Sequence, residues 1–207
     1  MNATDFGAHI KRLSPEAYLL FCTTDRPDFE RAAEALIDAK VATMQAGRAQ
    51  YRQLDERGLC LVLKDLLGVL VPCEAEPHSN GHVDLRLKHP DQPAWAYLVE
   101  AKIWRGAGWH RSGLDQLLGY ATGRAGRAMV LAFFRDHKRM LFLLKRLREE
   151  LREPNTHPRA LEECAESPLG AHAFTSLHEH QTGAQLMVTH LGCDLWDAGE
   201  EDDGVAP

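Results

Sequence analysis

Long apolar runs, paired cysteines and a leader-like start are all absent from this sequence of 207 residues. No apolar run approaches the roughly 20 residues of a membrane-spanning helix, and the first residues lack the basic and apolar regions of a signal peptide. The five cysteines are scattered singly without a Cys-X-X-Cys pair, which is typical of reduced thiols. These absences exclude the membrane-spanning and the disulfide-stabilised secreted classes, and they predict a cytoplasmic protein.

The length and composition predict one main domain with extensions at both ends. With 44% hydrophobic residues, the chain can bury a substantial core. We expect an N-terminal helical region over residues 1–50, a central domain over 51–192 and an acidic tail over 193–207. The tail has six acids in the ten residues from Asp194, a composition that predicts disorder.

Helical and extended patterns alternate along the chain. Helices are expected where apolar residues recur every three or four positions, and strands where they alternate or form short runs bounded by turn residues. The expected helices cover 15–21, 31–44, 54–67, 113–121 and 136–153, and the expected strands cover 69–75, 82–87, 95–103, 126–134, 171–178 and 185–190. This order predicts an α/β fold with a central mixed sheet flanked by helices.

Two of the expected strands, 82–87 and 95–103, form a hairpin whose register can be predicted. Between them lie residues 89–93, a cluster of turn formers in which two prolines cannot donate to a strand ladder. With Gln92 at the centre of the turn, Asp84 lies opposite Glu100, and their Cβ atoms are roughly 5 Å apart. Carboxylates this close repel each other unless a proton or a cation lies between them. A hard divalent ion with oxygen ligands fits this position.

Glu100 and Lys102 share a face of the second strand with Leu98, in otherwise apolar company. An ordinary surface ion pair on that face is one interpretation, and it would contribute at most ~1 kcal/mol. A lysine and a glutamate inside so apolar a strand are costly to desolvate unless they are paired or bind a metal. That cost favours a functional site.

These residues resemble the motifs of the PD-(D/E)XK nuclease superfamily, which has the restriction-endonuclease-like fold. The match covers roughly residues 54–135, and Val83 replaces the proline that gives the family its name. The resemblance implies that Asp84, Glu100 and the carbonyl of Ala101 bind Mg²⁺, for which Mn²⁺ can substitute. It also implies that Lys102 orients or activates the attacking water. The matching segments are Gly81-His82-Val83-Asp84, Glu100-Ala101-Lys102 and Gln116-Leu117-Leu118-Gly119-Tyr120.

The resemblance implies further site residues outside the hairpin. Gln116 and Tyr120 lie four positions apart on one helix and match an additional motif of several subfamilies. Their alternative role is to pack that helix against the sheet. A glutamate from an earlier helix often completes the site, for which Glu56 is the first candidate, while Glu74 and Glu76 compete with it.

Positive charge is concentrated in one part of the chain. Residues 102–148 contain eleven Lys or Arg against two acids, a net charge of +9, whereas the whole chain carries -6. A basic region beginning beside the expected metal site is typical of a surface that binds phosphates. Arg105, Trp109, His110 and Arg111 are the residues expected to bind nucleic acid, from a loop around the glycine-rich stretch 106–108. The alternative is that these charges only solvate helix faces, above all over 138–148.

Four histidines lie close together near the C-terminal end. His178 and His180 would share one face of a strand and could bind zinc, with His172 and His190 nearby. No cysteine pair or carboxylate has a helpful spacing, so surface or hydrogen-bonded histidines are the favoured interpretation.

Together these residues predict a magnesium-dependent endonuclease that hydrolyses phosphodiester bonds of DNA, with RNA and branched DNA as alternative substrates. The other interpretation is a catalytically inactive module of the same fold that binds nucleic acid or a partner protein. Bacterial phage defence and DNA repair are the expected settings. Cleavage of both strands would need two active sites, which predicts a homodimer.

Overall fold

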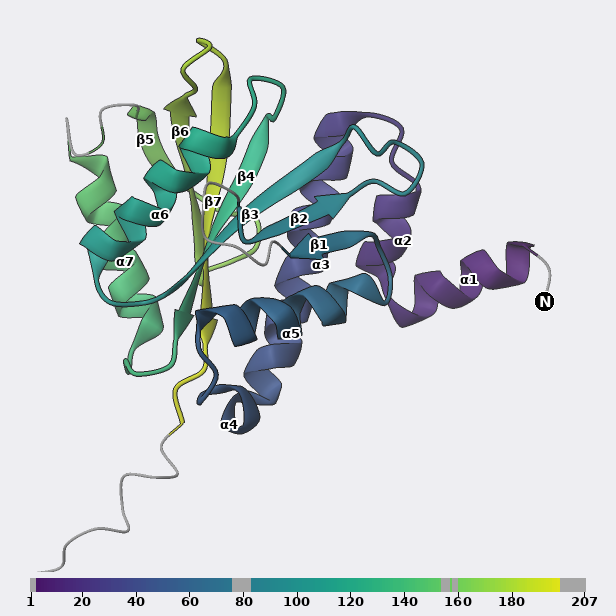
Figure 1. The fold of residues 1–207 in the computed structure, drawn as a ribbon, viewed down its shortest axis with the longest axis horizontal. Coiled ribbons are helices and arrows are strands. Elements are labelled where there is room, and N and C mark those ends of the chain that lie inside the picture. Colours follow the sequence, from purple (N-terminus) through teal and green to yellow (C-terminus); the bar gives the residue numbers. More distant parts are fainter. Residues whose placement is uncertain (1–2, 76–82, 154–156, 158–159, 198–207) are drawn as a thin grey trace, which may run out of the picture.

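The computed structural model describes residues 3–75, 83–153, 157 and 160–197. Within them, seven strands form one mixed sheet with helices on both faces (Figure 1), which confirms the predicted α/β class. The helices are α1 (Ala3–Leu13), α2 (Pro15–Phe21), α3 (Arg26–Ala46), α4 (Arg48–Tyr51), α5 (Glu56–Gly68), α6 (Ala107–Tyr120) and α7 (Met140–Arg152). The strands are β1 (Cys73–Ala75), β2 (Leu85–Lys88), β3 (Ala96–Ile103), β4 (Arg127–Phe134), β5 (Ala160–Glu166), β6 (Ala173–Glu179) and β7 (Gln185–Asp194).

The sheet is parallel at its centre and antiparallel at both sides. Its strand order is β1-β2-β3-β4-β7-β6-β5. Strands β3, β4 and β7 run parallel to one another, and the other neighbours are antiparallel. Seven of the eight residues of β4 are buried, because helices cover both faces of this central strand. No helix among the described residues is long and apolar enough to cross a membrane.

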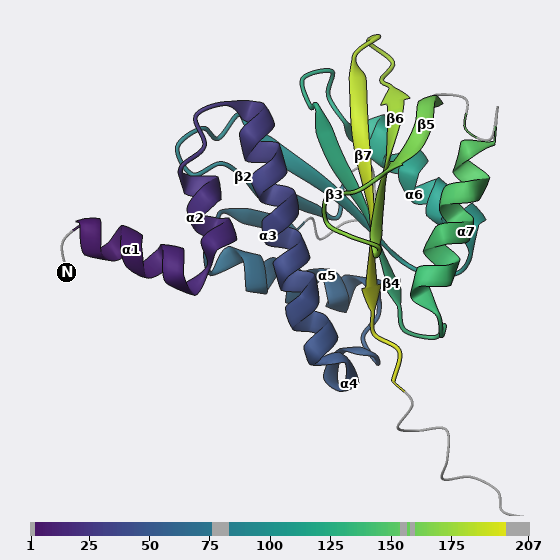
Figure 2. The same ribbon diagram turned by 180° about the vertical axis from the view of Figure 1, so that it is seen from behind.

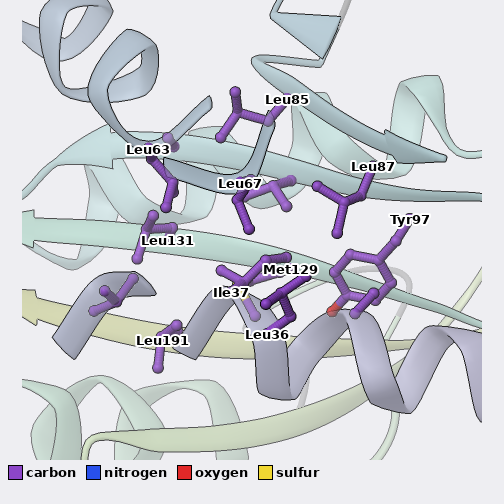
Figure 3. Packing of buried hydrophobic residues seen from close by; sticks show 14 of the residues in the cluster. Leu36, Ile37, Leu63, Leu67, Leu85, Leu87, Tyr97, Met129, Leu131 and Leu191 are labelled. Atoms are coloured by element: carbon purple, nitrogen blue, oxygen red, sulfur yellow. The ribbon is translucent and has the colours of Figure 1, made fainter. Parts of the chain in front are cut away.

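Helices α3 and α5 pack against one face of the sheet, and α6 and α7 pack against the other. Accordingly, α6 lies in front of the sheet in Figure 1, whereas α3 lies in front of it in Figure 2. Figure 3 shows the core on the α3 and α5 side of the sheet, where leucines of these helices meet apolar residues of β2, β3, β4 and β7. The labelled residues are Leu36, Ile37, Leu63, Leu67, Leu85, Leu87, Tyr97, Met129, Leu131 and Leu191.

A buried glutamate of α3 joins the N-terminal helices to the sheet. Glu34 is 3% exposed and accepts hydrogen bonds from Tyr97 Oη and Thr189 Oγ1, both at 2.9 Å. It also accepts two bonds from the guanidinium of Arg127, at 2.9 and 2.8 Å. The expected boundary at residue 50 therefore does not separate two cores. The boundary expected at 193 lies within β7, and most of the acidic tail, residues 198–207, lies outside the described residues.

Several predicted element boundaries differ from those observed. The first strand begins at Cys73 and not at residue 69, because Leu70 and Val71 still donate to the carbonyl of Leu67 and complete the end of α5. Strand β2 begins at Leu85 and not at residue 82. Helix α7 begins at Met140, after a left-handed residue at Arg139, and not at 136. Helices α1 and α4 and strand β5 lie in segments for which no element was predicted.

The helix after the hairpin is longer than predicted. It begins at Ala107 and not at 113, directly after Gly106, whose φ of 112° lies in the region that favours glycine. The expected glycine-rich loop is therefore mostly the first turns of α6. This moves Trp109, His110 and Arg111 from a loop onto a helix that packs against the sheet.

Candidate active site

The hairpin of β2 and β3 has the predicted register. Leu85 pairs with Val99 and Leu87 pairs with Tyr97, so one further step brings Asp84 opposite Glu100. Asp84 lies just before β2, and its Oδ2 accepts a hydrogen bond of 2.8 Å from the backbone N–H of Ala101. The carboxylate of Asp84 is thereby fixed against the middle of the Glu100-Ala101-Lys102 motif.

The segment predicted as a strand over 82–87 departs from the predicted alternation around Asp84. Val83 packs with the residues beneath α6, whereas Leu85 and Leu87 pack with the core beneath α3 and α5. Strict period-two alternation would place all three on one face. The chain is irregular at Val83 and Asp84, and this irregularity turns the Asp84 side chain toward the backbone of β3.

Glu100 and Lys102 form a buried ion pair on the α6 side of β3. They are 3% and 8% exposed, and Lys102 Nζ lies 2.7 Å from Glu100 Oε1. The second carboxylate oxygen, Glu100 Oε2, is buried and has no hydrogen-bond partner among the residues that the structure describes. A buried charged oxygen without a donor costs free energy, so this atom is suited to receive a cation or a water.

Glu56 reaches the same site from the start of α5. Its Oε2 accepts a hydrogen bond of 2.9 Å from the backbone N–H of Ile103, and its Oε1 lies 3.6 Å from Lys102 Nζ. The preceding residue, Asp55, caps α5 by accepting from the N–H of Gly58, which places Glu56 in the first helical turn. Of the competing residues, Glu74 is exposed and pairs with Lys88 instead, and Glu76 lies outside the described residues.

The charges and the burial of the cluster together raise the pKa of Lys102 and that of Glu100. Burial, followed by the negative charge of Asp84, raises the pKa of Glu100 to about 7 despite the hydrogen bond from Lys102. Burial also raises the pKa of Asp84, against the opposing effect of the Ala101 N–H. For Lys102, burial alone would lower the pKa, but the hydrogen bond and charge of Glu100 outweigh it and raise the pKa. Lys102 is therefore an ammonium ion and not a base.

The donor set fits a hard divalent cation. Asp84, Glu100 and Glu56 present only oxygen, the ligand atom that Mg²⁺ prefers. Ala101, the third predicted ligand, is 0% exposed in β3, where it directly follows Glu100 and its backbone N–H donates to Asp84. Among the described residues, no group of three or more His, Cys, Asp or Glu is arranged to hold a metal ion, since Glu100 and Glu56 are turned toward Lys102.

A glycine of α6 allows the helix to lie directly on the lysine, a contact that was not predicted. A Cβ on Gly113 would lie 3.0 Å from Lys102 Cγ, 3.3 Å from Lys102 Cε and 3.6 Å from Glu100 Cγ. The aliphatic stem of Lys102 is thus clamped between β3 and the backbone of α6. No signal in the sequence indicated this contact, because Gly113 stood at the start of the expected helix, and only the observed start of α6 at Ala107 places this glycine inside it.

Gln116 and Tyr120 lie on α6, and among the described residues no hydrogen bond joins either side chain to the acidic residues. Gln116 is exposed one turn beyond Gly113, and its side chain forms no hydrogen bond within the part of the chain that the structure describes. Tyr120 is half-buried and packs against the cluster beneath α6. A direct role of Gln116 in the site stays a prediction, whereas the packing of Tyr120 beneath α6 is observed.

The residues expected to bind nucleic acid divide into two groups. Arg105 is exposed and lies over the ring of Trp109, which is 43% exposed, at 5.3 Å from the ring centroid. Arg111 is half-buried on the next turn. His110 is 1% exposed, and its Nε2 lies 2.8 Å from Nδ1 of His190. This burial contradicts the expectation that His110 contacts nucleic acid.

His110 belongs to a buried hydrogen-bonded chain of histidines. Ser176 Oγ lies 2.6 Å from His178 Nε2 and 2.7 Å from His190 Nε2. Burial lowers the pKa of His110 to about 3 and of His178 to about 4, and it lowers the pKa of His190 well below its usual value. The rings are therefore neutral and hydrogen-bonded, which is the interpretation that the sequence favoured over zinc binding. The other two histidines of that group bond elsewhere, His172 to Asp38 and His180 to Thr182.

Comparisons of the chain with protein-family models, with curated proteins and with solved structures found no match in any of the three.

Proposed function

We propose that this protein is a magnesium-dependent nuclease that hydrolyses phosphodiester bonds of DNA. The observation that carries the proposal is the convergence of Asp84, Glu100 and Glu56, from three separate segments, around the buried ammonium of Lys102. A structural ion pair would not need two extra carboxylates and would not leave Glu100 Oε2 without a donor. The resemblance of these residues to the PD-(D/E)XK motifs supports the same chemistry.

The protein residues have distinct tasks in this proposal. Asp84, Glu100 and the carbonyl of Ala101 would hold the cation, with Glu56 as a further ligand. Bound Mg²⁺ would supply Lewis acidity toward the phosphate and the attacking water. Lys102, which is charged, would orient that water and stabilise the negative charge that develops on the phosphate oxygens. Gly113 would be a positioning residue, since it holds the Lys102 stem in place.

A substrate panel tests the activity. Duplex DNA, single-stranded DNA, branched DNA and RNA, each end-labelled, are incubated with the protein with and without Mg²⁺ or Mn²⁺. We expect shortened DNA products only when the divalent ion is present. Intact substrates under all conditions would refute the nuclease and leave a binding module as the function.

Magnesium binding should strengthen as pH rises. Below pH 7, Glu100 is largely protonated and a poor ligand, whereas above pH 7 it is a carboxylate, because its pKa is about 7. Competition with one proton makes the affinity for Mg²⁺ about tenfold higher at pH 8 than at pH 6. Calorimetric titration with MgCl₂ measures this. Glu100→Gln should abolish the pH-dependent part, and equal affinities at both pH values in the wild type would contradict the assigned role.

Gly113→Ala should impair cleavage, whereas Gly119→Ala should not. Both replacements lie within α6, where alanine favours the helix by roughly 1 kcal/mol over glycine. A Cβ at Gly119 meets nothing within 4 Å, but at Gly113 it presses on Lys102. We expect a loss of about tenfold or more in kcat for Gly113→Ala with KM nearly unchanged, and a normal kcat for Gly119→Ala. Equal kcat values for the two variants would show that Gly113 does not position Lys102 for cleavage.

A further inference from the structure

A small pocket opens just beyond the candidate active site, where β3 and β4 end. It has a volume of about 280 Å³ and lies between the start of α6 and one side of α7. Lys102 is only three residues from Arg105 in its rim, which limits the separation of their Cα atoms to roughly 10 Å. That span corresponds to about three nucleotides along a duplex axis. The side chains that decide its chemistry are those of Trp104, Arg105, His137, Arg146 and Glu150.

The pocket has a rigid aromatic wall. Trp104 is 6% exposed and stacks on Phe134, with ring centroids 4.8 Å apart. Its backbone N–H donates to the carbonyl of Phe133, which extends the pairing of β3 with β4 by one residue. The wall is therefore part of the sheet, and its position relative to Lys102 is set by the same strand.

Two arginines lie at the rim of the pocket. Within the part of the chain that the structure describes, neither Arg105 nor Arg146 forms an ion pair. Arg105 instead lies over the exposed ring of Trp109, which holds its guanidinium at the rim. Glu150 is the one acid among the lining residues and lies one turn from Arg146, yet among the described residues no ion pair joins the two. Two guanidinium groups left unpaired at a concave site are suited to a phosphate.

We propose that this pocket binds a backbone phosphate of the DNA strand beside the scissile bond, with Arg146 and Arg105 as its ligands. The inference rests on the proposed nuclease function and extends it. It specifies the path of the strand, from Lys102 across the ends of β3 and β4 to α7. It also assigns a role to Arg146, which lies in the part of the basic segment where solvated charges were the alternative interpretation.

Arg146→Gln and Lys145→Gln form a matched pair for the test. Both side chains are exposed neighbours on α7 and both changes remove one positive charge, but Lys145 lines a different groove, on the side of β6. Binding of a fluorescein-labelled duplex is measured in EDTA over a range of salt concentrations, so that no cleavage occurs. Unfolding midpoints of both variants confirm that they fold.

We expect Arg146→Gln to weaken binding roughly eightfold at 0.1 M salt and to make the plot of log K against log [salt] shallower by about 0.9, the loss of one phosphate contact. Lys145→Gln should retain the wild-type slope. Equal slopes and affinities for the two variants, or no binding by the wild type, would overturn the proposal that this pocket binds a phosphate. If the Arg146 effect is found but Mg²⁺ elicits no cleavage, the pocket stands and the nuclease proposal fails.

Discussion

Lys102→Ala should reduce magnesium-dependent DNA cleavage by roughly a hundredfold to a thousandfold, the usual effect of removing one group that stabilises developing charge. Asp84→Ala should reduce it at least as much, because it removes a cation ligand. Lys102 is the only cation that touches Glu100 among the described residues, and it also lies 3.6 Å from Glu56. Single-turnover cleavage of a labelled duplex measures the loss.

Two further lysine variants make this result interpretable. Lys102→Met keeps an unbranched apolar stem against Gly113 but removes the ammonium, so a loss as large as that of Lys102→Ala is expected if charge is what matters. Lys64→Ala removes a lysine that pairs with Asp65 on the surface of α5 and should cleave normally. A Lys102→Met protein that folds and cuts at the wild-type rate would end the proposal.

Glu34→Ala should lower the free energy of unfolding by about 3–5 kcal/mol, the cost of removing one partner of a buried ion pair. The change leaves the hydroxyls of Tyr97 and Thr189 and the guanidinium of Arg127 without their acceptor. These three side chains lie on β3, β7 and β4, so the loss loosens α3 from the centre of the sheet. Urea-induced unfolding followed by circular dichroism measures the change.

Asp65→Ala is the matched comparison for Glu34→Ala. It also deletes a carboxylate that pairs with a basic side chain, but the pair with Lys64 is exposed and should contribute less than about 1 kcal/mol. If both variants unfold at the same urea concentration, the Glu34 network does not stabilise the fold as inferred.

The hairpin could be predicted from the sequence because its signals are local. Two prolines and the polar residues between 89 and 93 define a turn, and a pleated strand turns its side chains alternately to opposite faces. The pairing of Leu85 with Val99 follows from those two facts, and it brings Asp84 next to the Glu100-Ala101-Lys102 motif. The apolar run of β4 and the proline that begins α2 were readable for the same reason.

The remaining features of the site depend on contacts between distant segments. Glu56 reaches Ile103 across 47 positions, and Gly113 touches Lys102 only because α6 crosses β3 at that point. The residues around His110 in the sequence do not indicate that its ring is buried. The ring is enclosed because it meets His190, which is bonded to Ser176, and both lie on strands far along the chain. No periodicity within one segment contains that information.

The amino-acid order alone determined which residues share a strand face, where the turn lies and how charge is distributed along the chain, since these depend on neighbours a few positions apart. The tertiary structure decided which acids surround Lys102, which arginines remain unpaired and which histidines are buried. Those properties arise from the docking of α5, α6 and α7 on the sheet, and the docking depends on shape and desolvation summed over the whole core.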